Sequence, residues 1–250
     1  MILPLDTSTH ILREQGPFKI RRMHPGAMLG DAADGGFGGL GLIDHANLSP
    51  GLTVGMHEHR NDEIISYLRE GMMMHQDSTG ATEEVRPNRL MVMNSGSGFS
   101  HKEQVPGPQN VRMLQIFVRP SAPDLTPGVQ FVDLAETYSL NQWRLLSGPE
   151  GSGALTSVRQ QIMLHDVRLE AGKSLSLPER GNMDAWLYVF GGEVVLGETR
   201  LATNDAVAIT DGYSPTLQAS TTSDLVLFLV DRSAPASHAG TLSGRQRLHN

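Results

Sequence analysis

The sequence predicts an all-β protein made of two similar halves. Short apolar runs rich in β-branched residues recur between Gly, Pro, Asn and Asp turns, a spacing that is typical of an all-β sandwich or barrel. Few stretches carry a helical periodicity for long. Two parts of the chain also share a weak repeat. The 250 residues are enough for two modest domains or one large β structure.

Turn residues separate the runs that we expect to form strands. These runs are residues 39–48, 63–71, 89–94, 111–118, 159–169, 185–197, 205–210 and 225–231. Residues 133–148 carry the clearest helical pattern, so we expect one or two helical turns there, linking the halves. This places an N-terminal domain at residues 1–132 and a C-terminal domain at residues 133–235. Residues 236–250 are small, polar and unpatterned, and we expect a flexible tail.

The repeat relates segments of the first half to segments of the second. The matched pairs are residues 66–71 with 187–192, 90–93 with 206–209, and 114–118 with 225–230. In the first pair, Tyr67 falls on Tyr188 and Gly71 on Gly192. Because one unit of this repeat is a whole set of hairpins, the pattern indicates a duplicated β-barrel rather than a solenoid.

Charge and composition limit the partners that the chain can have. The formal net charge is −7, and Lys and Arg are scattered, so direct binding to nucleic acid is not expected. No apolar run approaches the roughly 20 residues of a membrane-spanning helix, and the first ten residues lack the pattern of a signal peptide. We therefore expect a cytoplasmic protein without membrane attachment. The chain has no cysteine, so His, Asp or Glu must hold any metal.

Two pairs of residues suit a metal site. Alternate residues of a strand point to the same face, so His57 and His59 project together, and so do His101 and Glu103. A single pair of this kind is more often a surface feature than a site. If the two strands lie side by side, however, three imidazoles and a carboxylate converge, a set that suits iron, manganese, copper, nickel or zinc.

Other residues near these pairs leave alternatives open. Glu63 follows His59 by four residues, so it is either a rival carboxylate ligand or a partner that fixes the tautomer of an imidazole. His75 and Asp77 share a face of the next strand, where we expect them to make cross-strand hydrogen bonds. Several apolar residues can line a cavity for a flat aromatic ligand or form ordinary barrel core. They are Met56, Met72, Met74, Met91, Met93 and Phe99.

Over residues 30–120 the sequence resembles the pirin family of the cupin superfamily. The motifs that carry the resemblance are Phe37-Gly38, Ser49-Pro50-Gly51, His57-Glu58-His59, Ile65 to Gly71, His75-Gln76-Asp77-Ser78 and His101-Lys102-Glu103. The resemblance implies a bicupin, in which two antiparallel β-barrels of the double-stranded β-helix, or jelly-roll, type pack face to face. It also implies one metal in the N-terminal barrel, with His57, His59, His101 and Glu103 as ligands. It thus favours Glu103 over Glu63.

The second half offers no comparable set of ligands. The match of Tyr67 to Tyr188 places Pro178 and Arg180 where the pair of histidines stands in the first half. No later pair resembles His101 and Glu103. We therefore expect a C-terminal barrel without metal ligands that serves as a packing partner.

The resemblance implies two kinds of function. The first is an iron-dependent dioxygenase of the quercetin 2,3-dioxygenase type, which acts on a small flavonol-like or enol substrate with dioxygen. Its cofactor would be one divalent metal, Fe(II) before Mn, Cu, Ni or Zn, and Glu103 would be both ligand and catalytic proton acceptor. The alternative is a non-enzymatic, metal- and redox-dependent regulator that binds a protein partner. A metal-free, sugar-modifying cupin is disfavoured by the complete ligand set.

Overall fold

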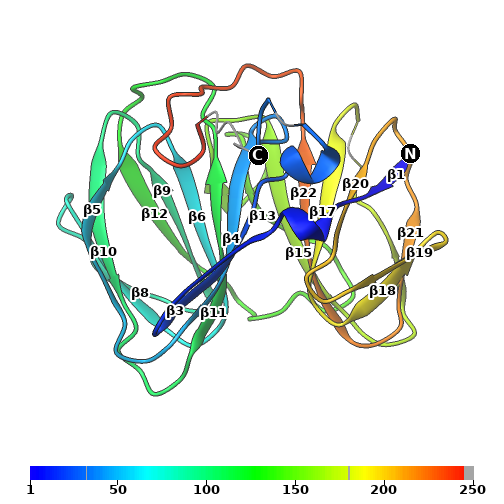
Figure 1. The fold of residues 1–250 in the computed structure, drawn as a ribbon, viewed down its shortest axis with the longest axis horizontal. Coiled ribbons are helices and arrows are strands. Elements are labelled where there is room, and N and C mark those ends of the chain that lie inside the picture. Colours follow the sequence, from blue (N-terminus) through cyan, green and yellow to red (C-terminus); the bar gives the residue numbers. More distant parts are fainter. Residues whose placement is uncertain (32, 180, 245–250) are drawn as a thin grey trace. The chain divides into compact units, whose positions relative to one another are not determined.

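The computed structural model describes residues 1–31, 33–179 and 181–244, and in them the chain is all β. Its only helical elements among these residues are two short 3-10 turns, η1 (Thr7–Thr9) and η2 (Ala27–Leu29). Figure 1 shows the strands. Contacts divide the chain into two units. The N-terminal unit comprises Thr9–Thr137, Val158–Gln160 and the described residues from Ala234 onward, and the C-terminal unit comprises Met1–Ser8, Tyr138–Ser157 and Gln161–Ser233.

Two antiparallel sheets form the N-terminal unit. The larger runs in the order β12 (Gly128–Asp133), β9 (Arg89–Asn94), β6 (Glu63–Glu70), β11 (Val111–Val118), β4 (Leu40–Leu48), β3 (Phe18–Met23) and β2 (Ile11–Gln15). The smaller runs in the order β5 (Thr53–His59), β10 (Phe99–Gln104), β7 (Met73–Asp77) and β8 (Thr82–Val85). Alternate residues such as Ile64 and Leu68 of β6 enter one buried core, because successive side chains of a strand point to opposite faces.

The C-terminal unit has the same two kinds of sheet. The larger runs in the order β1 (Ile2–Pro4), β20 (Ala206–Ile209), β17 (Asp184–Gly191), β22 (Ser223–Val230), β15 (Ile162–Leu169), β13 (Arg144–Gly148) and β14 (Thr156–Ser157). The smaller runs in the order β16 (Ser174–Ser176), β21 (Thr216–Ala219), β18 (Glu193–Leu196) and β19 (Thr199–Ala202). All pairs are antiparallel except the short parallel pair of β13 and β14. Leu187, Leu227 and their neighbours form its core.

The strand orders confirm the predicted duplication. The run β9-β6-β11-β4 of one unit corresponds to β20-β17-β22-β15 of the other, and β5-β10-β7-β8 corresponds to β16-β21-β18-β19 (Figure 1). Tyr67 and Tyr188 lie on the matching strands β6 and β17. After these strands, Gly71 and Gly192 turn the chain with φ of +76° and +95°, a conformation that favours glycine. The all-β, two-barrel jelly-roll class is therefore confirmed, whereas the face-to-face packing stays a prediction.

The helical turns expected in residues 133–148 are absent, so that prediction is wrong. Asp133 ends β12, and β13 (Arg144–Gly148) is a strand that pairs with β15. Leu146 of β13 is fully buried, and Trp143 packs against the core of the C-terminal unit. Pairing and burial at this sheet thus override the local helical periodicity.

Segments from both ends of the chain cross the predicted domain boundaries. Strand β1 pairs with β20, so the first residues lie in the C-terminal unit. The last described residues lie in the N-terminal unit, where the Ser237 amide donates to the Pro120 carbonyl at 2.7 Å and the Thr241 amide to the Arg60 carbonyl at 2.9 Å. The division into domains at residues 1–132 and 133–235 stays a prediction, as does the flexibility of the tail at residues 236–250. Residues 245–250 lie outside the described part.

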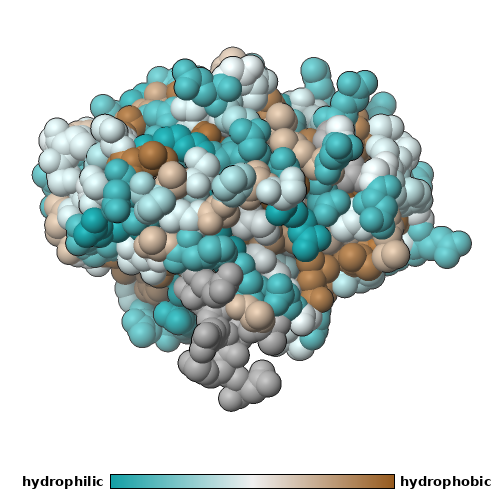
Figure 2. Space-filling view, turned by 90° about the horizontal axis from the view of Figure 1, so that it is seen from above, coloured by the Kyte–Doolittle hydropathy of each residue, from teal (hydrophilic) through white to brown (hydrophobic). Residues whose placement is uncertain are grey.

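The exposed side chains are mainly polar on the face that Figure 2 shows, where apolar residues form separate areas among hydrophilic ones. Large hydrophobic side chains that stand in solvent include Leu12, Met56 and Tyr213. Scattered apolar residues of this kind are ordinary on a folded protein. Within the described residues, no helix has the length and hydrophobicity that crossing a membrane requires.

Replacement of Leu187 by Ala is expected to destabilise the C-terminal unit by about 2–5 kcal/mol, because Leu187 is fully buried and a cavity would remain. Both tryptophans of the chain, Trp143 and Trp186, lie in this unit, so urea unfolding followed by tryptophan fluorescence measures the effect. Leu12→Ala is the control, since Leu12 is 61% exposed. Equal midpoints for Leu187→Ala and the unsubstituted protein would contradict this description of the core.

Candidate metal centre

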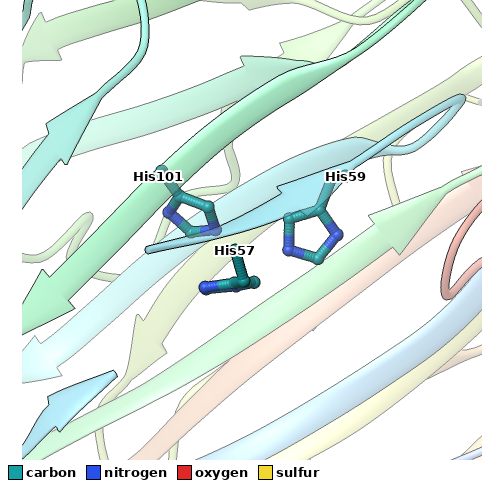
Figure 3. Close-up of side chains that lie close together, drawn as sticks. All are labelled: His57, His59 and His101. Carbon is teal, nitrogen blue, oxygen red and sulfur yellow. The ribbon is translucent and has the colours of Figure 1, made fainter. Parts of the chain in front are cut away.

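The strands that carry the predicted ligands lie side by side. In the pairing of β5 with β10, His57 stands opposite His101, and His59 stands opposite Phe99. The three imidazoles turn toward one another (Figure 3). Their ring centroids are 4.4 Å apart for His57 and His101, 4.9 Å for His57 and His59, and 5.2 Å for His59 and His101. The structure thus brings together the three predicted histidines.

Glu103 reaches the same cluster from β10. Its Oε1 lies 3.6 Å from Nδ1 of His101. The described residues hold two groups of possible metal-binding atoms, and within each group these atoms lie within 4.8 Å of one another. The first group comprises His57, His59 and His101, and the second comprises His75, His101 and Glu103. His101 belongs to both groups, so the predicted ligands surround one ring. The place of Glu103 in the same coordination sphere as His57 and His59 stays a prediction.

Hydrogen bonds fix the orientation of two of the imidazoles. Nδ1 of His57 lies 2.8 Å from the carbonyl oxygen of Gly55, which can only accept, so this nitrogen carries the proton. Nδ1 of His59 lies 3.4 Å from Oδ2 of Asp62, which assigns the same tautomer if the carboxylate is ionised. The Nε2 atoms are then free of protons and able to bind a metal, as in proteins whose histidine ligands are held by outer partners.

His101 has no such partner. Its side chain is fully buried, and within the described residues neither of its ring nitrogens has a hydrogen-bond partner. Burial, together with the neighbouring His57 and His59, lowers the pKa of His101 to about 2, so the ring stays neutral. A buried polar atom without a partner is rare in a folded protein. A neutral, unpaired imidazole beside two others is therefore a donor set that fits a metal ion.

Burial also shifts the pKa of other groups in the cluster. It lowers the pKa of His57, against the hydrogen bond to Gly55, and it lowers the pKa of His75, against Asp77. Burial raises the pKa of Glu103 to about 7, and the hydrogen bond from Gln115 opposes this effect. A metal cation nearby would favour the carboxylate form of Glu103.

Glu63 is engaged elsewhere. Its carboxylate is fully buried and accepts hydrogen bonds from Nε of Arg159 at 2.8 Å and from Nη2 of Arg159 at 2.6 Å. Asn94 also donates to it. Glu63 belongs to neither donor group, and the carboxylate beside His59 is that of Asp62. Neither of the two roles considered for Glu63 matches its contacts. The carboxylate that contacts an imidazole is that of Asp62, and the sequence signal for it is its position three residues after His59.

His75 is closer to the centre than its sequence position suggested. Its Nε2 lies 2.8 Å from Oδ2 of Asp77 on the same strand, so the expected cross-strand hydrogen bond is replaced by one within β7. Its Nδ1 is buried and has no partner within the described residues. His75 also stands opposite Glu103 in the pairing of β7 with β10. These contacts make His75 a further candidate donor beside His101.

A row of polar side chains crosses the inner face of the larger sheet next to Glu103. Gln115 donates to the carboxylate oxygens of Glu103 at 3.3 and 3.5 Å. Across the strands, Gln115 stands between Ser66 and Asp44. The hydroxyl of Ser66 is buried and has no hydrogen-bond partner in the described part of the chain. This row gives the interior of the barrel polar atoms that can meet the hydroxyl groups of a ligand.

Three of the six apolar residues considered as a lining belong to the buried core. Met91, Met93 and Phe99 are almost fully buried in the core of the N-terminal unit, whereas Met56 is 55% exposed. Of the two interpretations, ordinary core therefore applies to these three. Phe117 lies nearer the centre, with its ring centroid 5.9 Å from that of His59.

Both donor groups found in the described residues belong to the N-terminal unit. In the C-terminal unit, β16 and β21 correspond to β5 and β10, and neither carries a histidine. Pro178 follows β16, and Arg180 lies outside the described residues. That the C-terminal barrel works without a metal stays a prediction.

In the comparison with known proteins, different family profiles match the two parts of the chain. The pirin family profile matches residues 19–118, and the profile of the quercetinase C-terminal cupin domain matches residues 145–230. A quercetin 2,3-dioxygenase of Escherichia coli is 26% identical over 194 residues, which are 77% of this chain and 83% of that protein. A Mycobacterium bovis protein, provisionally named for the same activity, is 30% identical over 195 residues, 76% of this chain and 79% of that protein.

Among solved structures, the bacterial pirin YhhW of Escherichia coli in complex with nickel(II) superposes with a TM-score of 0.80. It is 24% identical, and the match covers 94% of this chain and all of that chain. The fold and the histidine cluster define a two-barrel cupin with a candidate metal centre in its N-terminal unit. The chain belongs to the pirin family.

Replacement of Glu63 by Gln is expected to leave the metal in place and to lower the free energy of unfolding by on the order of 3 kcal/mol, because it breaks a buried ion pair with Arg159. Glu103→Gln is the matched variant and is expected to lose most of the metal. Elemental analysis and urea unfolding followed by circular dichroism measure the two effects. Loss of metal from Glu63→Gln alone would show that Glu63 is the carboxylate ligand.

Proposed function

We propose that the chain binds one divalent metal through His57, His59, His101 and Glu103. We further propose that it is a dioxygenase of the quercetin 2,3-dioxygenase type that acts on a small flavonol-like or enol substrate. The observation that carries the proposal is the cluster of three imidazoles in which, within the described residues, neither buried ring nitrogen of His101 has a hydrogen-bond partner. Relatives named quercetin 2,3-dioxygenase support the reaction class. A cytoplasmic location stays a prediction from the sequence.

The donor set favours a first-row divalent metal. Imidazole nitrogen suits iron, copper, nickel and zinc, and a carboxylate also suits manganese. We propose Fe(II) first, with Mn, Cu, Ni or Zn as alternatives, and the nickel(II) complex of the Escherichia coli pirin supports nickel as one of these alternatives. When bound, such a metal supplies Lewis acidity that lowers the pKa of a substrate hydroxyl and access to dioxygen chemistry.

The side chains of the barrel supply the remaining functions. Glu103 is the proposed proton acceptor, because its carboxylate is almost fully buried and stands next to His101. Gln115 holds this carboxylate by hydrogen bonds. The buried hydroxyl of Ser66 beside it has no partner among the described residues and can bind a polar group of the substrate. Phe117 packs beside His59 and helps to exclude water, which strengthens electrostatic interactions in the site.

A regulator without enzymatic activity is the alternative. His57 is only partly buried, and its neighbours Met56 and Glu58 are exposed on β5. One ligand of the proposed centre therefore lies close to the surface, where a protein partner could distinguish two oxidation states by their charge. This alternative requires the same metal site but no turnover of a small substrate.

The experiment that separates these functions combines elemental analysis with oxygen uptake. After anaerobic loading with Fe(II), the protein is expected to hold close to one metal per chain and to consume oxygen when quercetin is added. His57→Ala is expected to reduce both to background, because it removes one nitrogen of the cluster. Leu12→Ala, on the exposed edge strand β2, is the control and is expected to keep both the bound metal and the oxygen uptake. A metal-loaded protein without oxygen uptake would favour the regulator. A protein that binds no metal would exclude both the dioxygenase and the metal-dependent regulator.

A further inference from the structure

Asp62 stands between a proposed metal ligand and the end of the described chain. Its side chain is fully buried in the turn between β5 and β6, and it makes no ion pair with Lys or Arg within the described residues. Its backbone is pinned by Ser95, whose hydroxyl accepts from the Asp62 amide at 2.9 Å and donates to the Asp62 carbonyl at 2.7 Å. A buried carboxylate needs several hydrogen-bond donors. The groups that donate to the Asp62 carboxylate therefore indicate its role.

The donors to the Asp62 carboxylate come from two sides. Residues 242 and 243 supply one side: the Ser243 amide donates to Oδ1 at 2.9 Å, the Ser243 hydroxyl to Oδ1 at 2.6 Å, and the Leu242 amide to Oδ2 at 3.1 Å. His59 supplies the other side, with its Nδ1 at 3.4 Å from Oδ2. One carboxylate thus joins a proposed ligand to a segment 180 residues away in sequence.

That segment is firmly attached to the N-terminal unit. Thr241 exchanges hydrogen bonds with Arg60, since its hydroxyl accepts from the Arg60 amide at 2.8 Å and its amide donates to the Arg60 carbonyl at 2.9 Å. The buried Arg119 donates through Nε to the Ser243 carbonyl at 2.6 Å. Leu242 packs against the hydrophobic core. The segment therefore has a defined position from which it can hold Asp62.

The fit between this segment and Asp62 leaves no room for another side chain. A Cβ atom placed on Gly240 would lie 2.5 Å from Oδ1 of Asp62 and would overlap the hydroxyl of Ser243. The φ of Gly240 is one that other residues adopt, so the position is restricted to glycine by these overlaps and by the Asn61 carbonyl oxygen, which would lie 2.9 Å from the Cβ atom. Gly240 can therefore be used to displace Asp62 without removing its charge.

We infer that Asp62 is a positioning residue for His59, and that residues 240–243 hold Asp62 in place and so set the affinity of the metal centre. The Asp62 carboxylate accepts a hydrogen bond from Nδ1–H of His59, which keeps the proton on Nδ1 and leaves Nε2 free for the metal. The inference rests on the metal-binding part of the proposed function. It assigns to residues 240–243 a role in metal binding, although none of them is a proposed ligand.

Substitution of Asp62 by Asn tests the first part. The amide keeps the shape of the side chain, but its NH2 group faces a donor in either orientation: His59 Nδ1–H and the Leu242 amide at the Oδ2 position, or the Ser243 amide at the Oδ1 position. The first orientation drives His59 toward the other tautomer, whose Nε2 carries a proton and cannot bind a metal, and the second disrupts the contact of position 62 with Ser243. We expect the affinity for Co(II), used alone as the probe, to fall by about 10- to 100-fold. The visible absorption of bound Co(II) is also expected to change, because it reports the number and arrangement of ligands.

Substitution of Gly240 by Ala tests the second part. We expect roughly a tenfold loss of Co(II) affinity, as for other changes to residues that orient metal ligands. Gly107→Ala is the matched control, because it is the same substitution in the same unit and its Cβ would meet nothing within 4 Å. Circular dichroism before titration restricts the comparison to folded protein. If Gly240→Ala does not fold, Ser243→Ala, which removes one donor to Asp62, takes its place.

The outcomes separate this inference from the proposed function. If the unsubstituted protein binds no Co(II), the metal centre itself is excluded. If it binds Co(II) and both variants match it within twofold with the same spectrum, the metal centre stands and the role of Asp62 is overturned. If only Asp62→Asn binds weakly, the role of the C-terminal segment is overturned. Weak binding by both, with Gly107→Ala unchanged, supports the inference.

Discussion

The site depends on one constraint: three imidazoles share a small space inside a β-barrel, and within the described residues not all of their ring nitrogens have hydrogen-bond partners. In His101, neither of the two buried ring nitrogens has a hydrogen-bond partner within the described residues. A buried polar atom left in this state costs about 1–3 kcal/mol. Burial keeps the ring neutral, with its pKa near 2, so its lone pair is available. The surrounding strands have to hold these rings in place, and the hydrogen bonds of His57 and His59 orient them.

The duplicated fold shows what turns a barrel into a candidate metal centre. The strands β5 and β10 correspond to β16 and β21, yet β16 is three residues long and β21 four, against seven and six in the N-terminal unit. The shorter strands carry no histidine. Their unit instead fills its interior with residues such as Leu187 and Leu227. The same topology therefore supports either a polar cluster or a closed apolar core, depending on a few inward positions.

Much of the fold and part of the candidate site could be predicted from local sequence patterns. The strands and the repeat follow from periodicity and turn residues, and the spacing of His57 and His59 follows from the alternation of a strand. The errors arose where distant contacts decide the outcome. Within residues 133–148, Arg144–Gly148 form the strand β13 because β15 is available to pair with it. Asp62 and Glu63 are adjacent in sequence, but Asp62 meets Ser243 and Glu63 meets Arg159, contacts that span 181 and 96 residues. No local pattern contains that information.

Anomalous diffraction from crystals of the protein loaded with a stoichiometric amount of Ni(II) tests the metal centre most directly. A single strong peak is expected among the imidazoles, about 2.1 Å from a nitrogen of each of His57, His59 and His101. The Glu103 carboxylate, rather than that of Glu63, is expected to complete the site. A peak at an exposed histidine with none at the cluster would contradict the assignment of the centre. So would a metal at the cluster bound through Glu63 after release of Arg159.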